Sequence, residues 1–194
     1  MIPAIVFENV ESPRLIMRRI VASDKDVMYR IFSEHEIVKW AGCRILKDKS
    51  ESIEHINSYE ERYQASSQIA WGMELKETRE MIGFVALSYI DRNHAYAWLG
   101  SSLLPEYNNM GFTTEANKAV INFAFTHTEL NRIESQVYEK HTAMLRVNEK
   151  SGMIREAVIR ENFNIDGKYE NSIMYSIIKS DFLNKRDFYN FSKK

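Results

Sequence analysis

Hydrophobic residues recur at helical spacing in four parts of the chain. Val27, Met28, Ile31 and Phe32 follow Ser23 and Asp24, two residue types that cap helices, and this pattern predicts a helix. Apolar residues that recur every three or four positions predict three more helices. These run from about residue 50 to 63, from Phe112 or Thr113 to about 124, and over residues 142–151, before Gly152.

Strands are predicted where apolar and polar side chains alternate, or where β-branched and aromatic residues gather. The predicted strands are residues 14–20, 68–75, 81–90, 95–104, 132–138, 155–163 and 168–177. The last two flank Asn164-Ile-Asp-Gly167, whose Asp-Gly pair is typical of a tight hairpin. Pro105 ends the fourth strand because proline has no amide hydrogen to donate. The order of elements predicts a mixed α/β (α+β) fold with a central, mainly antiparallel sheet flanked by helices.

Two segments follow neither spacing. Residues 35–46 are predicted to be irregular, and this segment contains Trp40 and Gly42. Irregular segments on a packed scaffold often carry ligand contacts. The tail of residues 179–194 is polar with several aromatic residues, which leaves open whether it docks as a short helix or frays. No linker or repeat divides the rest, so we expect one domain over 1–194 with a core at about 12–178.

Composition and charge narrow the classes of protein. A chain of 194 residues can bury a core without disulfides or structural metal. Its 26 basic and 27 acidic side chains argue against a nucleic-acid partner, since binding to a phosphate backbone needs accumulated Lys and Arg. Cys43 is the only cysteine, and no Cys/His spacing predicts a metal site. The sequence lacks both a membrane-spanning apolar run and a basic signal-peptide start, so we expect no membrane partner and a cytoplasmic location.

Residues 103–116 carry the clearest chemical signal. A strand is predicted to end there and a long amphipathic helix to begin. The first amides of a helix have no internal acceptor and the helix dipole makes this end positive, so a phosphate can bind there. Gly111 has no Cβ and would allow close approach. A single glycine before a helix is more often an ordinary turn, so this segment alone leaves both interpretations open.

Four blocks of the sequence, in order, resemble the RimJ/RimL-type branch of the GNAT superfamily of N-acetyltransferases. They are Ser12-Pro-Arg-Leu-Ile-Met-Arg18; Leu103-Leu-Pro-Glu-Tyr107 with Gly111-Phe-Thr-Thr-Glu-Ala116; Arg146-Val-Asn-Glu-Lys-Ser-Gly-Met153; and Arg155-Glu-Ala-Val-Ile-Arg160 with Asp166-Gly-Lys-Tyr169 and Met174-Tyr-Ser176. The resemblance covers about residues 12–177. It implies a sheet splayed at a V-shaped cleft between the strand that ends at Leu104 and the strand 132–138, with acetyl-CoA as co-substrate in that cleft.

The resemblance also implies how acetyl-CoA is held. The pantetheine arm would bond to the backbone near Ser102 and Leu103, and the pyrophosphate would lie on amides from Asn109 to Thr113. The expected cofactor-binding residues are Ser102, Leu103, Asn108, Asn109, Met110, Gly111, Phe112, Thr113 and His141, the last in place of a family asparagine that contacts the CoA arm. Only Gly111 remains of the family's loop glycines, and we expect Asn109 to replace one of them in a left-handed conformation.

Direct attack on the thioester requires the amine to lose a proton and the departing thiolate to gain one. The chain departs from the family at these positions, because Trp98 stands where the branch often has Glu and Met144 where it often has Ser. Tyr138 is the expected substitute proton donor. The candidate bases are Glu74 and, in the segment after the first helix, His35 with Glu34.

Each candidate also has an ordinary explanation. Glu74, Glu34 and His35 are also explained as surface charges, Tyr138 as a half-buried strand residue, and His141 as a solvated residue at a helix start. Three aromatic residues are expected to line an amine pocket by cation–π contact, although core packing explains them equally well: Tyr89, Tyr96 and Trp98.

Two functions follow as expectations. The first is an acetyl-CoA-dependent N-acetyltransferase, an acyltransferase whose acceptor is a protein N-terminal α-amino group or a small-molecule amine, without metal. The second is a non-catalytic CoA-binding or sensor protein on the same scaffold, which the replacements at Trp98 and Met144 motivate. An interaction module without CoA ranks below both. The sequence leaves monomer and homodimer open.

Overall fold

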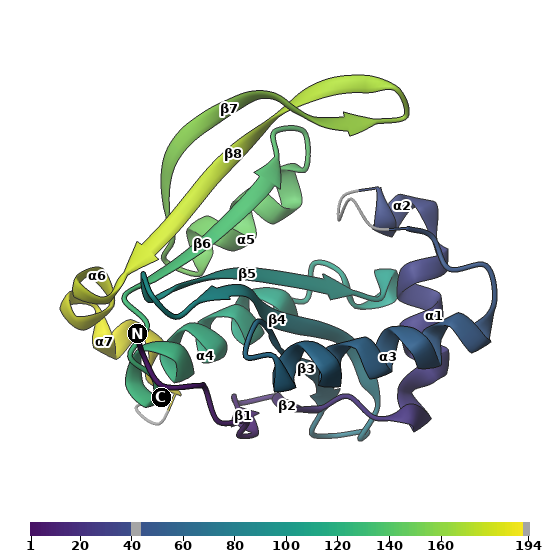
Figure 1. Ribbon diagram of the computed structural model, residues 1–194, viewed down its shortest axis with the longest axis horizontal. Coiled ribbons are helices and arrows are strands. Elements are labelled where there is room, and N and C mark those ends of the chain that lie inside the picture. The colour runs from purple at the N-terminus through teal and green to yellow at the C-terminus, as the bar shows by residue number, and fades with distance from the viewer. Residues whose placement is uncertain (40–43, 192–194) are drawn as a thin grey trace.

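The computed structural model describes residues 1–39 and 44–191, which form an eight-stranded sheet (Figure 1). The strand order is β1-β2-β3-β4-β5-β6-β8-β7. The strands are β1 (Val10–Glu11), β2 (Leu15–Arg19), β3 (Ile69–Leu75), β4 (Met81–Asp91), β5 (Tyr96–Leu103), β6 (Arg132–Tyr138), β7 (Ile154–Ile165) and β8 (Lys168–Ile178). Every neighbouring pair is antiparallel except β5 and β6. The seven predicted strands are confirmed within two residues at each end, and β1 was not predicted.

The helices are α1 (Lys25–Ser33), α2 (His35–Val38), α3 (Lys49–Gln64), α4 (Phe112–His127), α5 (Thr142–Lys150), α6 (Lys179–Asn184) and α7 (Arg186–Tyr189). The irregular segment predicted over 35–46 is wrong at its start, because α2 forms there; Trp40, Gly42 and Cys43 lie outside the described residues. The tail docks: Phe182 and Tyr189 are fully buried against the core. No helix in the described ranges has the length and apolar character to cross a membrane.

Alternation along the strands divides the core between two faces of the sheet. Trp71 and Met73 point to the face that α4 covers, where they pack with Val120 and Phe123. Ala70 and Phe84 point to the opposite face, where α1 and α3 pack. Successive side chains of a strand point to opposite faces, so these buried strands carry apolar residues on both sides. Burial of one such large side chain stabilises the fold by roughly 1.5–3 kcal/mol.

The start of α1 differs from the predicted cap, and α3 has a cap that was not predicted. Asp24 precedes α1, but its carboxylate accepts hydrogen bonds from Arg18 and from the Val21 amide instead of capping the helix. Asp48 caps α3 by accepting from the amides of Ser50 and Glu51. An N-cap of this kind stabilises a helix by about 1 kcal/mol.

Candidate active site

The site is defined by a gap in the sheet between β5 and β6. These parallel strands pair only through Tyr96 with Arg132, Ala97 with Ile133 and Trp98 with Glu134. The last of these pairs, Trp98 with Glu134, is the vertex of the gap, and beyond it both strands continue but separate (Figure 1). β5 is still paired with β4 up to Leu103, and β6 with β8 up to Tyr138. In the part of the chain that the structure describes, the facing edges pair with no other strand beyond this point, as the predicted V-shaped cleft requires.

A loop with unused amide donors lies at the open end of the gap. Among the described residues, no acceptor pairs with the backbone amides of 109–114, and the first amide of this region that bonds is that of Glu115, to the Gly111 carbonyl. Gly111 is the N-cap of α4 with φ +81°, and Asn109 has φ +62°. The expected left-handed conformation of Asn109 is confirmed. Free amides at the positive end of a helix fit a phosphate.

Arg14, at the start of the β2 segment, fastens this loop. Its Nη1 donates to the Met110 carbonyl at 3.0 Å, its Nε donates to Glu115 Oε2 at 2.7 Å, and its guanidinium lies 4.2 Å from the centre of the Phe112 ring. Glu115 also accepts from the hydroxyl of Ser12 and the amide of Arg14. The motifs did not reveal this role, because the partners are about 100 positions apart in the sequence.

Tyr138 ends β6 on the other side of the gap. The last pair of the ladder is Trp98 with Glu134. Tyr138 lies four residues farther along β6 and is therefore level with Ser102, four residues farther along β5. Its ring is buried, lies 5.2 Å from that of Phe163, and burial raises its pKa above the ordinary tyrosine value. His141 follows at the start of α5, where burial, together with the charge of Lys39, lowers its pKa. The structure therefore brings Ser102, Leu103, Tyr138 and His141 to the two sides of one cleft.

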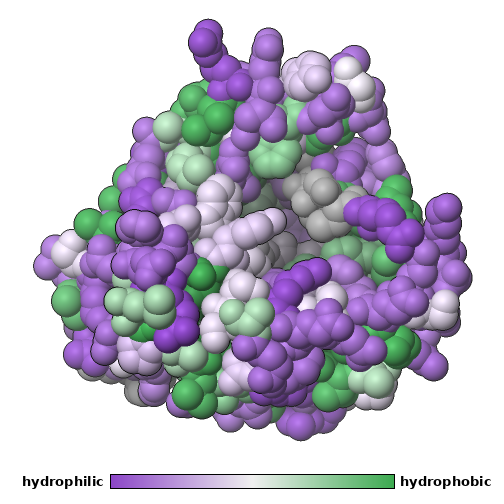
Figure 2. All heavy atoms as spheres, in the orientation of Figure 1, coloured by the Kyte–Doolittle hydropathy of each residue, from purple (hydrophilic) through white to green (hydrophobic). Residues whose placement is uncertain are grey.

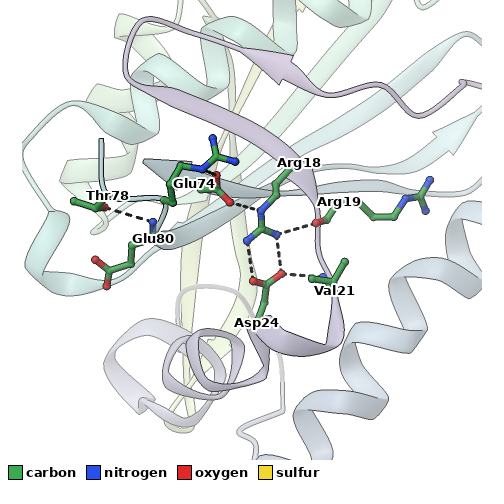
Figure 3. Close-up of polar contacts among 8 residues, drawn as sticks. Arg18, Arg19, Val21, Asp24, Glu74, Thr78 and Glu80 are labelled. Carbon is green, nitrogen blue, oxygen red and sulfur yellow. Dashed lines mark hydrogen bonds and ion pairs between the residues drawn. The ribbon is translucent and has the colours of Figure 1, made fainter. Parts of the chain in front are cut away.

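Glu74 lies away from this cleft, in a compensated cluster of ion pairs. It is on β3, two strands from β5, and its Oε2 accepts from Arg18 Nε at 2.5 Å. Its Oε1 lies 2.9 Å from Arg79 Nε. Arg18 also binds both oxygens of Asp24, so two guanidinium groups balance two carboxylates (Figure 3). Both oxygens of Glu74 therefore face arginines, and Glu74 lies away from the gap between β5 and β6.

His35 lies at the rim of the cleft. It begins α2 and is exposed, and its Nε2 lies 3.1 Å from Asp166 Oδ1 in the turn between β7 and β8. Its Nδ1 is 3.6 Å from Glu36. Glu34 precedes it and is exposed. His35 thus connects the two sides of the cleft opening rather than its vertex.

The vertex carries aromatic side chains and open space. The rings of Trp98 and Tyr89 meet edge to face with centroids 6.2 Å apart. Gly100, two residues farther along the same face, is exposed, and a Cβ there would meet no atom of the described residues within 4 Å. Tyr96 and Met144 are partly buried. Figure 2 shows that this face of the molecule is hollowed near its middle and rimmed mainly by hydrophilic residues.

Comparison with known proteins identifies the class. The sequence model of the acetyltransferase (GNAT) domain matches residues 14–154, so the chain belongs to the GNAT family of acetyltransferases. An uncharacterized N-acetyltransferase, YoaA of Bacillus subtilis (strain 168), is 29% identical over 174 residues, which are 90% of this chain and 98% of YoaA.

Two solved structures share the fold. The spermidine N-acetyltransferase of Vibrio cholerae, in complex with CoA and spermine, has a TM-score of 0.79 at 20% identity and covers 88% of this chain and 99% of its own. RimL, a ribosomal L7/L12 α-N-protein acetyltransferase in complex with coenzyme A, also has a TM-score of 0.79, at 15% identity over 88% and 98% of the two chains. The resemblance to the GNAT superfamily and the mixed, mainly antiparallel fold are therefore confirmed.

Proposed function

We propose that this protein transfers the acetyl group of acetyl-CoA to a primary amine, either a protein N-terminal α-amino group or a small-molecule amine. The observation that carries the proposal is the unpaired edge of β5 beyond Trp98, which leads to the free amides of residues 109–114. An extended arm with a diphosphate at one end matches both features. Residues 1–194 would act as one domain, with the docked tail as part of it.

In this proposal each part of acetyl-CoA has a place. The pyrophosphate lies on the amides of Asn109, Met110, Gly111, Phe112 and Thr113, next to Asn108. Because the Phe112 side chain is buried, only its backbone contributes.

The pantetheine arm bonds to the backbone of Ser102 and Leu103, and His141 contacts it from the far side. A pyrophosphate at the open end of the cleft directs the sulfur towards the vertex. A backbone N–H of β5 then polarises the acetyl carbonyl.

Tyr138 is the proposed donor of a proton to the departing thiolate. Its place on β6 level with Ser102 supports this role, and a tyrosine hydroxyl is protonated at neutral pH, as a donor requires. Glu74 and His35 are the bases that the sequence suggests. The balanced ion pairs of Glu74 and the exposed position of His35 give both weaker support than Tyr138 has.

The alternative is a non-catalytic CoA-binding or sensor protein. It is favoured by Trp98 and Met144, which replace the Glu and Ser that the branch often uses. The relatives named for spermidine and for a ribosomal protein suggest two acceptor classes to test.

Release of free thiol from acetyl-CoA separates the two functions. We expect turnover with at least one member of a panel of N-terminal peptides, spermidine and aminoglycosides, together with CoA binding measured by calorimetry. Binding without turnover of any amine would favour the sensor. Absence of both heat and thermal stabilisation at saturating acetyl-CoA would reject both.

A further inference from the structure

We propose that Glu134 of β6 is the carboxylate that binds the protonated acceptor amine and takes its proton, with the rings of Trp98 and Tyr89 beside it. The inference rests on the proposed acetyltransferase function and adds the acceptor side of the site. Its basis is the position of Glu134 at the vertex of the cleft, its charge surroundings and the open space next to it.

The position follows from strand register. Glu134 pairs with Trp98 in the last step of the parallel ladder, and paired residues of adjacent strands point to the same face. From Leu103 back to Trp98, β5 spans five residues, or about 17 Å. An arm that runs along β5 from the loop of Gly111 therefore points its sulfur towards Trp98 and Glu134.

The charges around Glu134 favour a cation. Arg132 Nε donates to Glu134 Oε1 at 2.6 Å, while both Nη atoms of Arg132 donate to the carboxylate of Glu156. One guanidinium thus serves two carboxylates, which leaves a net negative charge at the vertex. Among the described residues, none donates to Glu134 Oε2. Glu74 differs in that two arginines balance it and Asp24.

Aromatic rings and free space complete the amine site. A bulge in β4 between Ser88 and Asp91 puts Tyr89 in the left-handed region, with φ +50°, where its ring is held against Trp98. A backbone strained in this way costs of order 1–3 kcal/mol and is typical of functional sites. Exposed Gly100 leaves room over β5 on the same face. Aromatic faces beside a carboxylate suit an ammonium group.

In the proposed reaction the acceptor ammonium first gives one proton to the Glu134 carboxylate, directly or through a water. The freed lone pair of the nitrogen then attacks the thioester carbonyl carbon. A C–N bond forms and the C–S bond breaks. The sulfur leaves as a thiolate and takes up, through water, the second proton that the attacking nitrogen loses. Glu134 then releases its proton to solvent.

The test compares Glu134→Gln with Glu129→Gln, which removes one charge from an exposed carboxylate in the segment before β6. The amine probes are spermidine and a tetrapeptide that begins with alanine. We expect kcat/KM for the accepted amine to fall roughly 100-fold in Glu134→Gln, as for loss of a general base. The KM for acetyl-CoA and the thermal midpoint should stay unchanged, and Glu134→Asp should recover part of the activity. Glu129→Gln should match the wild type.

Equilibrium binding of spermidine to the CoA-bound protein gives a second readout that needs no turnover. Loss of charge at Glu134 should weaken this binding about tenfold or more. Turnover within threefold of the wild type in Glu134→Gln would overturn the role of Glu134 and leave the proposed function standing. If the wild type acetylates no amine of the full panel, but Glu134→Gln still weakens spermidine binding, the proposed function is rejected and the amine site is kept. A wild type that neither binds nor acetylates would reject both.

Discussion

Two glycines at helix ends have the same backbone conformation but different surroundings. Gly111 precedes α4 with φ +81°, and Gly152 follows α5 with φ +87°. At Gly152 the place of a Cβ is already filled, because the Tyr189 hydroxyl would lie 2.0 Å from it. At Gly111 the nearest atom would be Arg14 Nη2, at 3.6 Å. The chain fills the space at one helix end with its own tail and leaves it open at the other, as a ligand site requires.

The largest expected effect comes from closing the open space at Gly111. Gly111→Val adds a branched side chain where a phosphate must approach free amides. We expect CoA affinity to fall by at least about 100-fold, because several charge-assisted hydrogen bonds are lost together. Calorimetry with CoA measures the affinity, and circular dichroism checks that the fold persists.

The matched control is Gly167→Val in the turn between β7 and β8. Gly167 has φ +82° and no atom within 4 Å of a Cβ, so it carries the same backbone cost without a phosphate site. CoA affinity should stay unchanged in this control. Equal affinities of the Gly111 variant and the wild type would show that the phosphate does not bind at this helix end.

The second effect concerns the filled space at Gly152. Gly152→Ala forces a methyl group against the Tyr189 hydroxyl and strains the left-handed backbone, which together cost about 3 kcal/mol. For a chain of this size the thermal midpoint should fall by roughly 6–12 °C. Differential scanning calorimetry measures this change.

A double variant sharpens the comparison of the two glycines. Replacing Tyr189 with Leu removes the atoms that the added methyl group meets, so Gly152→Ala should cost less in that background than in the wild type. Additive losses would contradict the steric explanation, and weakened CoA binding without loss of stability would show that this helix end serves the ligand.

The sequence predicted what depends on local pattern and missed what depends on register. Alternation along the strands and the Asp-Gly turn were enough for seven of the eight strands of the sheet, all except β1. Gly111 and Asn109 were found because a family motif marks them. Glu134 was missed because its place at the vertex exists only once β5 and β6 are paired. Arg14 was missed because Met110 and Glu115 come near it only in the folded sheet.

Burial also distinguishes two candidate bases that the sequence left together. Glu74 and His35 were both expected as bases, since a carboxylate and an imidazole both accept protons. In the fold the first is buried between Arg18 and Arg79, and the second is exposed at the rim. The tail was undecided because its helices are short; Phe182 and Tyr189 hold them through tertiary contacts that no periodicity reveals.

The smallest expected effect is on the pH dependence of stability and concerns His55 of α3, which the chain packs against its own side chains, as it packs Gly152 against Tyr189. Its ring centroid lies 4.2 Å from that of Phe32, and its Nε2 lies 3.1 Å from the Tyr59 hydroxyl. Burial, assisted by the charge of Arg62, lowers the pKa of His55 from 6.5 to about 4. Between pH 6.5 and pH 4 His55 is therefore protonated in the unfolded chain and neutral in the folded chain. The contribution of His55 to stability is complete above about pH 6.5 and is lost as the pH falls towards 4.

Partial exposure of His55 reduces this loss, and we expect the free energy of unfolding, measured in urea, to fall by about 1 kcal/mol between pH 7.5 and 5. His55→Gln should flatten this dependence while His127→Gln, at an exposed position, should keep it; an unchanged slope in His55→Gln would assign the pH dependence to other groups.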